Sequence, residues 1–258
     1  MNNKKVYTEE KKNIGIIILN NPEKNNTFDV ELAVQLNEAL LEFENKKSIR
    51  VVIVKAEGKN FSMGISLDEF KDKTHREYTE FIRLMDKHNH TIAEMKKPVI
   101  ASVQGYAVAN GAGLVFASDL AVAGESAKIG TTAINVGLIC LGPASPLVRL
   151  VGRKKALEMI LTGEILTAQE AKELGLINRV VPDTELENET LKLAELLASK
   201  SPFALMAGKR GIYALQDVSY HEGIDYMSEL FAGLCATEDA EEGVKAFIER
   251  RKPLWKMK

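Results

Sequence analysis

Two glycine-containing turns are the segments whose residue types could do chemistry. One spans residues 60–67 (NFSMGISL) and the other spans residues 104–114 (QGYAVANGAGL), and each comes after an apolar run. Small residues let a ligand approach the main chain, and the N–H groups at the start of a helix have no partner within that helix. Two such turns could converge on one carbonyl oxygen, although either alone more often marks only a tight turn.

The surrounding pattern predicts the elements that must position these turns. Asp29 can cap a helix that runs to about Lys47, and a single amphipathic helix is predicted from Glu77 to Met95. The alternation of strands and helices predicts an α/β fold with crossover connections. Apolar runs predict buried strands at residues 14–19, 51–54, 99–103 and 120–123.

Helices predominate after about Pro143. Thr167 and Glu170 have the spacing of a capping box, which predicts a helix start. We expect an α/β core over residues 1–185 and a C-terminal helical region over residues 186–258 that belongs to the same functional unit. The predicted helices span residues 153–162, 167–174, 186–200, 202–215, 219–234 and 238–251.

Composition narrows the class of protein. The 258 residues are 45% hydrophobic, which suits a sizeable core in one large domain. The 34 basic and 36 acidic residues give no argument for nucleic acid or a membrane as a partner. Cys140 and Cys235 form no disulfide framework, and the charged N-terminus, interpreted as a solvated tail, lacks the apolar stretch of a signal peptide. We therefore expect a cytoplasmic protein with no span long enough for a bilayer.

The motifs together are far more specific than either turn. Asn21-Pro22 with Asn26, FSMGISLDEF, PVIASVQGYAVANGAGLVFASDLAVA, ALEMILTGEILTAQEAKELGLINRVVP and the closing EGVKAFIERRKPLW occur in this order. Over essentially its whole length the sequence resembles the enoyl-CoA hydratase/isomerase (crotonase) family. The resemblance implies repeated ββα units forming a spiral core, CoA thioesters as substrates without a prosthetic group or metal, and homotrimers or dimers of trimers. A Rossmann dinucleotide enzyme is disfavoured, because no G-x-G-x-x-G follows the first strand.

The resemblance also implies a ligand site. The two backbone N–H groups of the family's oxyanion hole fall on Ile65 and Asn110, and such donors stabilise charge on a thioester oxygen by about 3–4 kcal/mol each. Phe247 and Arg250 match C-terminal positions that can close the CoA site of a neighbour. The other positions carried over as substrate or CoA contacts are Lys24, Asn25, Met63, Gly64, Ile65, Leu67 and Gly111.

The departures from the family concern its acids. The two glutamates of family hydratases fall on Gly113 and Ala133, and a third acid position, an aspartate in some isomerases and dehalogenases, falls on Leu141. A hydratase needs groups that move protons, so its mechanism is not inherited intact. Cys140 is a candidate replacement, although a lone cysteine is more often a small buried hydrophobe. Other polar candidates, which could equally satisfy local structure, are Asn110, Thr131, Thr132, Asn135, His88 and His90.

Three functions remain open. The first is an enoyl-CoA hydratase or isomerase with relocated acid/base groups. The second is a decarboxylase of malonyl-type thioesters, in which loss of CO2 generates the enolate without a base. The third is an acyl-CoA binder without catalysis, which the loss of every family acid would favour.

Overall fold

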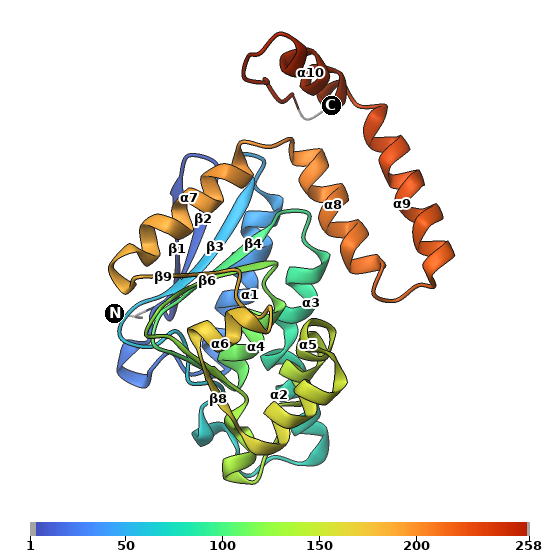
Figure 1. Cartoon of the computed structure of the whole chain (residues 1–258). Helices are drawn as coiled ribbons and strands as arrows, with labels where there is room; N and C mark the ends of the chain where they lie inside the picture. The colour runs from blue at the N-terminus through green and yellow to red at the C-terminus, as the bar shows by residue number, and fades with distance from the viewer. Residues whose placement is uncertain (1–3, 257–258) are drawn as a thin grey trace.

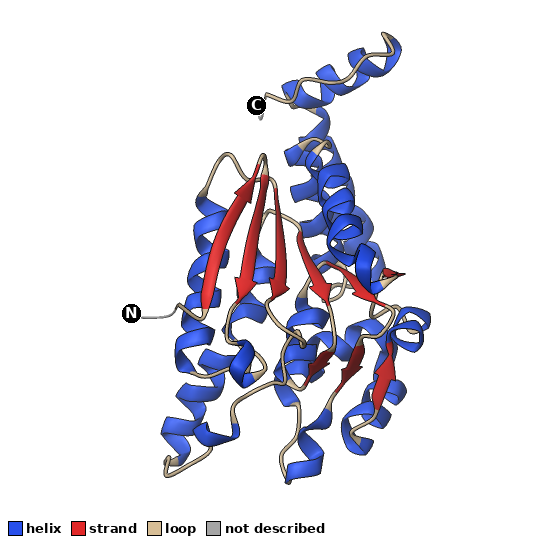
Figure 2. Cartoon of the chain, turned by 90° about the vertical axis from the view of Figure 1, so that its left-hand side faces the viewer, coloured by secondary structure: helices blue, strands red, loops and turns tan. Residues whose placement is uncertain are grey.

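A computed structural model describes residues 4–256 and confirms the α/β class. The main sheet has the order β1-β2-β3-β4-β6-β9, and Figure 2 shows its strands splaying between layers of helices. β1 is antiparallel to β2, and the later neighbours pair in parallel. Parallel strands covered on both faces read as continuous apolar runs, which is why the sequence revealed them. The strands are β1 (Val6–Lys11), β2 (Ile14–Leu19), β3 (Val51–Ala56), β4 (Val99–Val103), β6 (Leu120–Gly124) and β9 (Arg179–Val181).

A smaller sheet beneath the main one shows which unit of secondary structure repeats along the chain. It has the order β5-β7-β8, formed by β5 (Tyr106–Val108), β7 (Lys128–Gly130) and β8 (Ile165–Thr167). β4 lies in the main sheet, β5 in the small sheet, and α4 (Asn110–Ala117) follows; β6, β7 and α5 (Leu141–Thr162) repeat this order. The chain therefore contains the repeated ββα unit that the resemblance implies.

Helices cover both faces of the main sheet. α1 (Val30–Asn45), capped by Asp29 as predicted, contributes to the larger cluster of buried side chains. On the other face α7 (Leu186–Ala198) packs Leu193 and Ala194 against strand residues such as Val51. The remaining helices are α2 (His75–Met85), α3 (Lys87–Glu94), α6 (Ala168–Glu173), α8 (Pro202–Ala214), α9 (Tyr220–Cys235) and α10 (Glu238–Ile248). In Figure 1 α8 lies beside α3, and the chain beyond α8 extends away from this core.

Some predictions about local structure were wrong. Residues Val6–Lys11 are not a solvated tail but an edge strand, in which Val6 is buried and the last three residues are exposed; residues 1–3 lie outside the described residues. The helix predicted over residues 153–162 is present, but a helical stretch that was not predicted precedes it from Leu141, with Pro143 in its first turn, where the missing N–H costs nothing. A left-handed Gly152, with φ 75°, interrupts this helix.

The predicted helix from Glu77 to Met95 is in fact two helices. α2 ends at Met85 and α3 begins at Lys87, with Asp86 between them at φ −96° and ψ 1°. Thr74 starts α2 with a capping box that includes Glu77. None of the helices within residues 4–256 is both long and apolar enough to cross a lipid bilayer.

Candidate functional site

The two glycine-containing turns lie side by side. The Ser62 N–H donates to the Tyr106 carbonyl and the Val108 N–H donates to the Ser62 carbonyl, both at 3.0 Å. A Cβ on Gly64, which has φ 87°, would lie 2.6 Å from Cβ of Ala109 and 3.3 Å from the backbone nitrogen of Asn110. Such proximity requires glycine, so the sequence permits the two main chains to approach closely.

Backbone pairing also orients Ile65. The Phe28 N–H donates to the Gly64 carbonyl at 2.7 Å, and the Ser66 N–H donates to the Phe28 carbonyl at 2.8 Å. In such a parallel bridge the residue between the two bonded peptides points its own N–H away from the partner strand. The Ile65 N–H is therefore directed away from Phe28.

Asn110 stands at the beginning of α4. The first internal hydrogen bond of this helix joins the Gly113 N–H to the Ala109 carbonyl, so the Asn110 N–H belongs to the unpaired first turn. Gly111 packs equally closely, because a Cβ there would lie 2.4 Å from the Ser62 carbonyl oxygen. The structure thus brings together the segments that contain Ile65 and Asn110.

A fully buried asparagine joins the loop at residues 21–26 to the first turn. The Asn26 side chain donates to the carbonyls of Glu57 and Asn60, both at 2.9 Å, and accepts from the Asn21 N–H at 2.8 Å. Its own carbonyl accepts from the Ser62 hydroxyl at 2.7 Å. These bonds explain why Asn26 belongs to the motif.

The residues predicted to contact CoA from this loop and turn lie next to one another. Asn25 accepts from the Met63 N–H at 3.1 Å and, at its side chain, from Asn60 at 2.9 Å. Lys24 precedes it on an exposed 3-10 turn, and Met63 and Leu67 are 39% and 60% exposed. The structure therefore presents a cation and two exposed apolar side chains beside the paired turns.

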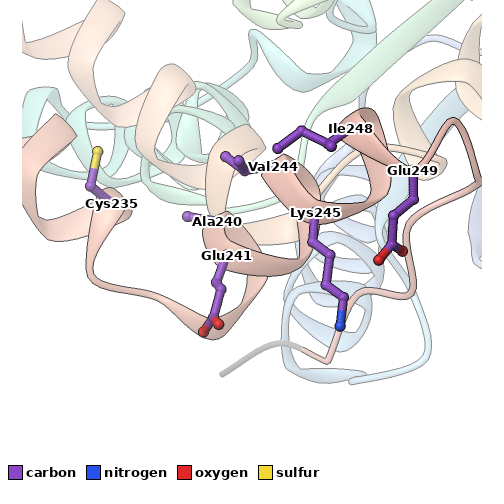
Figure 3. A pocket seen from close by; sticks show the side chains of 7 residues that line it. All are labelled: Cys235, Ala240, Glu241, Val244, Lys245, Ile248 and Glu249. Atoms are coloured by element: carbon purple, nitrogen blue, oxygen red, sulfur yellow. The ribbon is translucent and has the colours of Figure 1, made fainter.

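Phe247 and Arg250 are not part of this group within one chain. Both are exposed, Phe247 near the end of α10 and Arg250 just after it. In Figure 1 α10 lies at the opposite end of the molecule from α2, which follows the Met63 turn. A hollow of about 470 Å³ on α10, lined by Val244, Ile248 and Cys235 among others, is shown in Figure 3 and is likewise remote from the turns.

The positions of the family acids differ in what surrounds them. Gly113 is buried, and a Cβ there would lie 2.9 Å from Cγ of Pro143. Ala133 is partly exposed in the 3-10 turn Thr132–Val136, and Leu141 is 70% exposed at the start of α5. Cys140, just before α5, is 4% exposed, and burial raises the pKa of its thiol. A buried thiol with a raised pKa is a poor nucleophile, which favours the structural interpretation of Cys140.

The histidines and threonines separate into core and surface residues. The ring of His88 is fully buried 5.5 Å from the Phe28 ring, and burial lowers its pKa to about 4, whereas His90 is exposed. Among the described residues, Nε2 of His88 and Oγ1 of Thr131 are buried without a hydrogen-bond partner. Thr132 begins the 3-10 turn that contains Asn135, which is exposed.

Asp86 is the carboxylate that sequence reasoning missed. It accepts a 3.1 Å hydrogen bond from the side-chain amide of Asn110, and burial raises its pKa against the lowering effects of Asn110 and His90. A Cβ on Gly142 would lie 2.2 Å from both carboxylate oxygens, so the carboxylate rests against the first turn of α5. An aspartate within an amphipathic helical pattern favours a local cap, and this could have indicated the break.

A cleft opens beside this carboxylate. It has a volume of about 1060 Å³ and lies between α3, α5 and α8. Within residues 4–256, no group of three or more His, Cys, Asp or Glu side chains could hold a metal ion. Residues that line the cleft include Asp86, His90, Leu141, Gly142 and Lys209.

These repeated ββα units, with two paired turns at the start of α4, define a crotonase-type fold. Residues 9–258 match the model of the enoyl-CoA hydratase/isomerase family. The chain belongs to this family.

Individual relatives agree with that assignment. The chain is 34% identical to a probable mitochondrial enoyl-CoA hydratase of Dictyostelium discoideum, over 96% of this chain and 89% of the relative. It is 37% identical to the human mitochondrial enoyl-CoA hydratase domain-containing protein 3, over 93% and 79%. The crystal structure of that human protein aligns with a TM-score of 0.93 at 35% identity, covering 97% of this chain and 100% of the other. An enoyl-CoA hydratase of Mycobacterium smegmatis aligns with a TM-score of 0.93 at 33% identity, covering 97% and 98%.

Proposed function

We propose that this protein binds a CoA thioester and stabilises its enolate with the backbone N–H groups of Ile65 and Asn110. The observation that carries the proposal is the pairing of the two turns, with the Asn110 nitrogen 3.3 Å from the position of a Cβ on Gly64. The Ile65 N–H points away from Phe28, and the Asn110 N–H is free of the helix ladder. Two preorganised donors aimed at one developing oxyanion contribute about 3–4 kcal/mol each to its stabilisation.

The exposed group beside the turns would bind the CoA moiety. Lys24 supplies a positive charge for phosphate, while Met63 and Leu67 offer apolar surface for the adenine. Phe247 and Arg250 would complete such a site from a second copy, since they lie far from it in their own chain.

Assembly of several copies is therefore part of the proposal. Phe231, Phe247 and Ile248 are 66%, 85% and 72% exposed on α9 and α10. Soluble monomers rarely expose large contiguous apolar patches, so these helices favour self-association. The resemblance to the family makes a trimer or a dimer of trimers the proposed form.

Hydration by the two family glutamates is not the reaction that this site supports. Gly113 leaves no room for a side chain against Pro143, and Ala133 carries no acid. Decarboxylation was favoured because the site lacked acids. That argument is weaker in the structure, because Asp86 lies beside Asn110. Proton transfer at the acyl chain of the thioester remains as the best supported class of reaction.

The experiment compares two glycine substitutions at left-handed positions. Gly64→Ala introduces both backbone strain and a contact with Ala109, whereas Gly175→Ala, at φ 79°, has nothing within 4 Å of the new Cβ. Calorimetric titration with butyryl-CoA and octanoyl-CoA should show binding by wild type and by Gly175→Ala, and strongly weakened binding by Gly64→Ala. Absence of acyl-CoA binding by the wild-type protein would overturn the proposal.

A further inference from the structure

The chain has lost the family acids, but a carboxylate from another element, Asp86, is hydrogen-bonded to the side chain of Asn110. The side-chain amide of Asn110 donates to Asp86 at 3.1 Å, and the backbone N–H of this asparagine is one of the two proposed donors to the thioester oxygen. The carboxylate also lies against Gly142, the residue after Leu141, which occupies the third family acid position. Asp86 therefore brings an acid to the region between Asn110 and the start of α5.

The surroundings of Asp86 do not serve stability. It is partly buried, its side chain accepts a hydrogen bond from a neutral amide, and burial raises its pKa. An acid whose pKa is higher in the folded than in the unfolded chain lowers the free energy of unfolding at pH values above both. A destabilising buried carboxylate at a cleft is the arrangement in which acid/base groups are found.

Access to Asp86 comes from the cleft between α3, α5 and α8. An acyl chain whose thioester oxygen is held by the Asn110 N–H would begin beside the residue whose side chain bonds Asp86, and Asp86 itself lines the cleft. Any side chain larger than glycine at position 142 would collide with the carboxylate, so Gly142 is what allows it to lie there.

We propose that Asp86 removes a proton from the acyl chain of the bound thioester and returns it, in place of the family glutamates. This inference rests on the proposed function. The carboxylate takes the proton of a C–H bond at the α-carbon, or at the γ-carbon of an α,β-unsaturated chain. The electron pair of that bond forms the enolate or dienolate, and the carbonyl pair moves to the oxygen held by Ile65 and Asn110. Return of the proton to either carbon regenerates the carboxylate, so no oxidant or further reactant is consumed.

This chemistry selects enoyl-CoA thioesters as the substrate class and migration of a double bond as the reaction. A single carboxylate suffices for it, because the group that takes the proton also gives it back. Asp86 borders the cleft, so its protonated form can exchange with solvent before the proton returns.

Deuterium incorporation tests the role directly. The full-length protein is incubated in D2O with octanoyl-CoA, which cannot isomerise, and deuterium at the acyl chain is measured by mass spectrometry. Asp86→Asn keeps the shape and an acceptor for Asn110, and should exchange about 100- to 10,000-fold more slowly while binding octanoyl-CoA as before. Glu80→Gln removes an exposed charge on α2 that forms a surface ion pair with Arg76, and should exchange like wild type. The rates of double-bond migration in 3-octenoyl-CoA should rank wild type and the two variants in the same order.

Two further variants separate proton transfer from a structural role. Gly142→Ala should abolish deuterium exchange, because the new side chain displaces the Asp86 carboxylate. The double variant Gly142→Ala/Asp86→Asn should exchange deuterium no more slowly than Asp86→Asn alone. Asn110→Ala keeps the backbone N–H but removes a donor that lowers the pKa of Asp86, so its rate–pH profile should move to higher pH. The charged and titratable groups nearest Asp86 are His90 on α3 and Cys140 before α5. Other such groups that line the same cleft are Glu94, Asp119, Arg149, Lys209, Tyr213 and Asp217.

The outcomes are distinguishable. Binding with exchange that depends on Asp86 supports the inference. Equal exchange by wild type and Asp86→Asn, or binding without any exchange, overturns the role of Asp86 but leaves acyl-CoA binding intact. Failure of the wild-type protein to bind acyl-CoA overturns the proposed function itself.

Discussion

A Cβ on Gly113 would lie 2.9 Å from Cγ of Pro143. Gly113 is on α4 and Pro143 is in the first turn of α5, so the ring of the proline occupies the space into which a side chain at position 113 would extend. The missing family glutamate is therefore not a simple deletion, because the neighbouring helix has closed over its position. An enzyme of this family with such packing must take its acid from elsewhere or use none.

This packing predicts that restoring the glutamate fails. Gly113→Glu should lower the free energy of unfolding by at least about 1–3 kcal/mol, the usual cost of overpacking a core. The variant should not acquire the ability to hydrate crotonyl-CoA. Denaturant unfolding and thioester absorbance measure the two effects.

A matched pair of alanine substitutions provides the control. Gly113→Ala meets Pro143, whereas Gly208→Ala on α8 has nothing within 4 Å of its Cβ. We expect the first to destabilise and the second to be neutral or to gain up to about 1 kcal/mol from helix propensity. Equal effects would contradict the packing argument.

The buried His88 predicts how stability depends on pH. Its pKa falls from 6.5 to about 4 on folding because burial disfavours the charged ring. The unfolded chain therefore binds the proton more readily, so stability is complete above pH 6.5 and declines as the pH falls from 6.5 to about 4. The decline should reach about 3 kcal/mol at about 1.4 kcal/mol per pKa unit. Urea unfolding across this range should give a flatter profile for His88→Leu; an unchanged slope would show that other groups cause the decline.

The pair formed by Lys209 and Asp119 predicts how α8 is held on the core. Their side chains are 6% and 12% exposed and 2.7 Å apart, and Asp119 also accepts from the Val99 N–H and the Tyr213 hydroxyl. Removing one member of a buried ion pair costs about 3–5 kcal/mol, because the other charge remains buried. Lys209→Met should therefore destabilise strongly, with a large part recovered in Lys209→Met/Asp119→Asn. Additive losses in thermal unfolding would argue against coupling of the two charges.

The two cysteines should differ sharply in reactivity. Cys235 is exposed, whereas Cys140 is buried with a raised thiol pKa. Iodoacetamide at neutral pH should modify Cys235 first, and Cys140 only slowly. Cys140→Ala should retain proton exchange in octanoyl-CoA, since the thiol takes no part in it. Rapid modification of Cys140, or loss of exchange in this variant, would return it to the candidates for catalysis.

How well the sequence predicted the structure depended on the range of the interactions. Strands such as Val51–Ala56 and caps such as Thr167 with Glu170 were readable because burial and capping leave a local pattern. β1 was missed because an edge strand with polar side chains resembles a solvated segment. The break at Asp86 was missed because periodicity continues across it, while the groups that hold its carboxylate, Asn110 and Gly142, are distant in the chain.

The sequence by itself determined the α/β class and the family, and it singled out the two glycine-containing turns, since close approach of a main chain requires small residues. It also showed that the family acids are absent at Gly113, Ala133 and Leu141. Only the tertiary structure decided that Pro143 fills the space beside Gly113 and that the side chain of Asn110 donates a hydrogen bond to Asp86. Both facts arise from contacts between residues 30 and 24 positions apart in the chain, and no periodicity or motif in the sequence encodes these contacts.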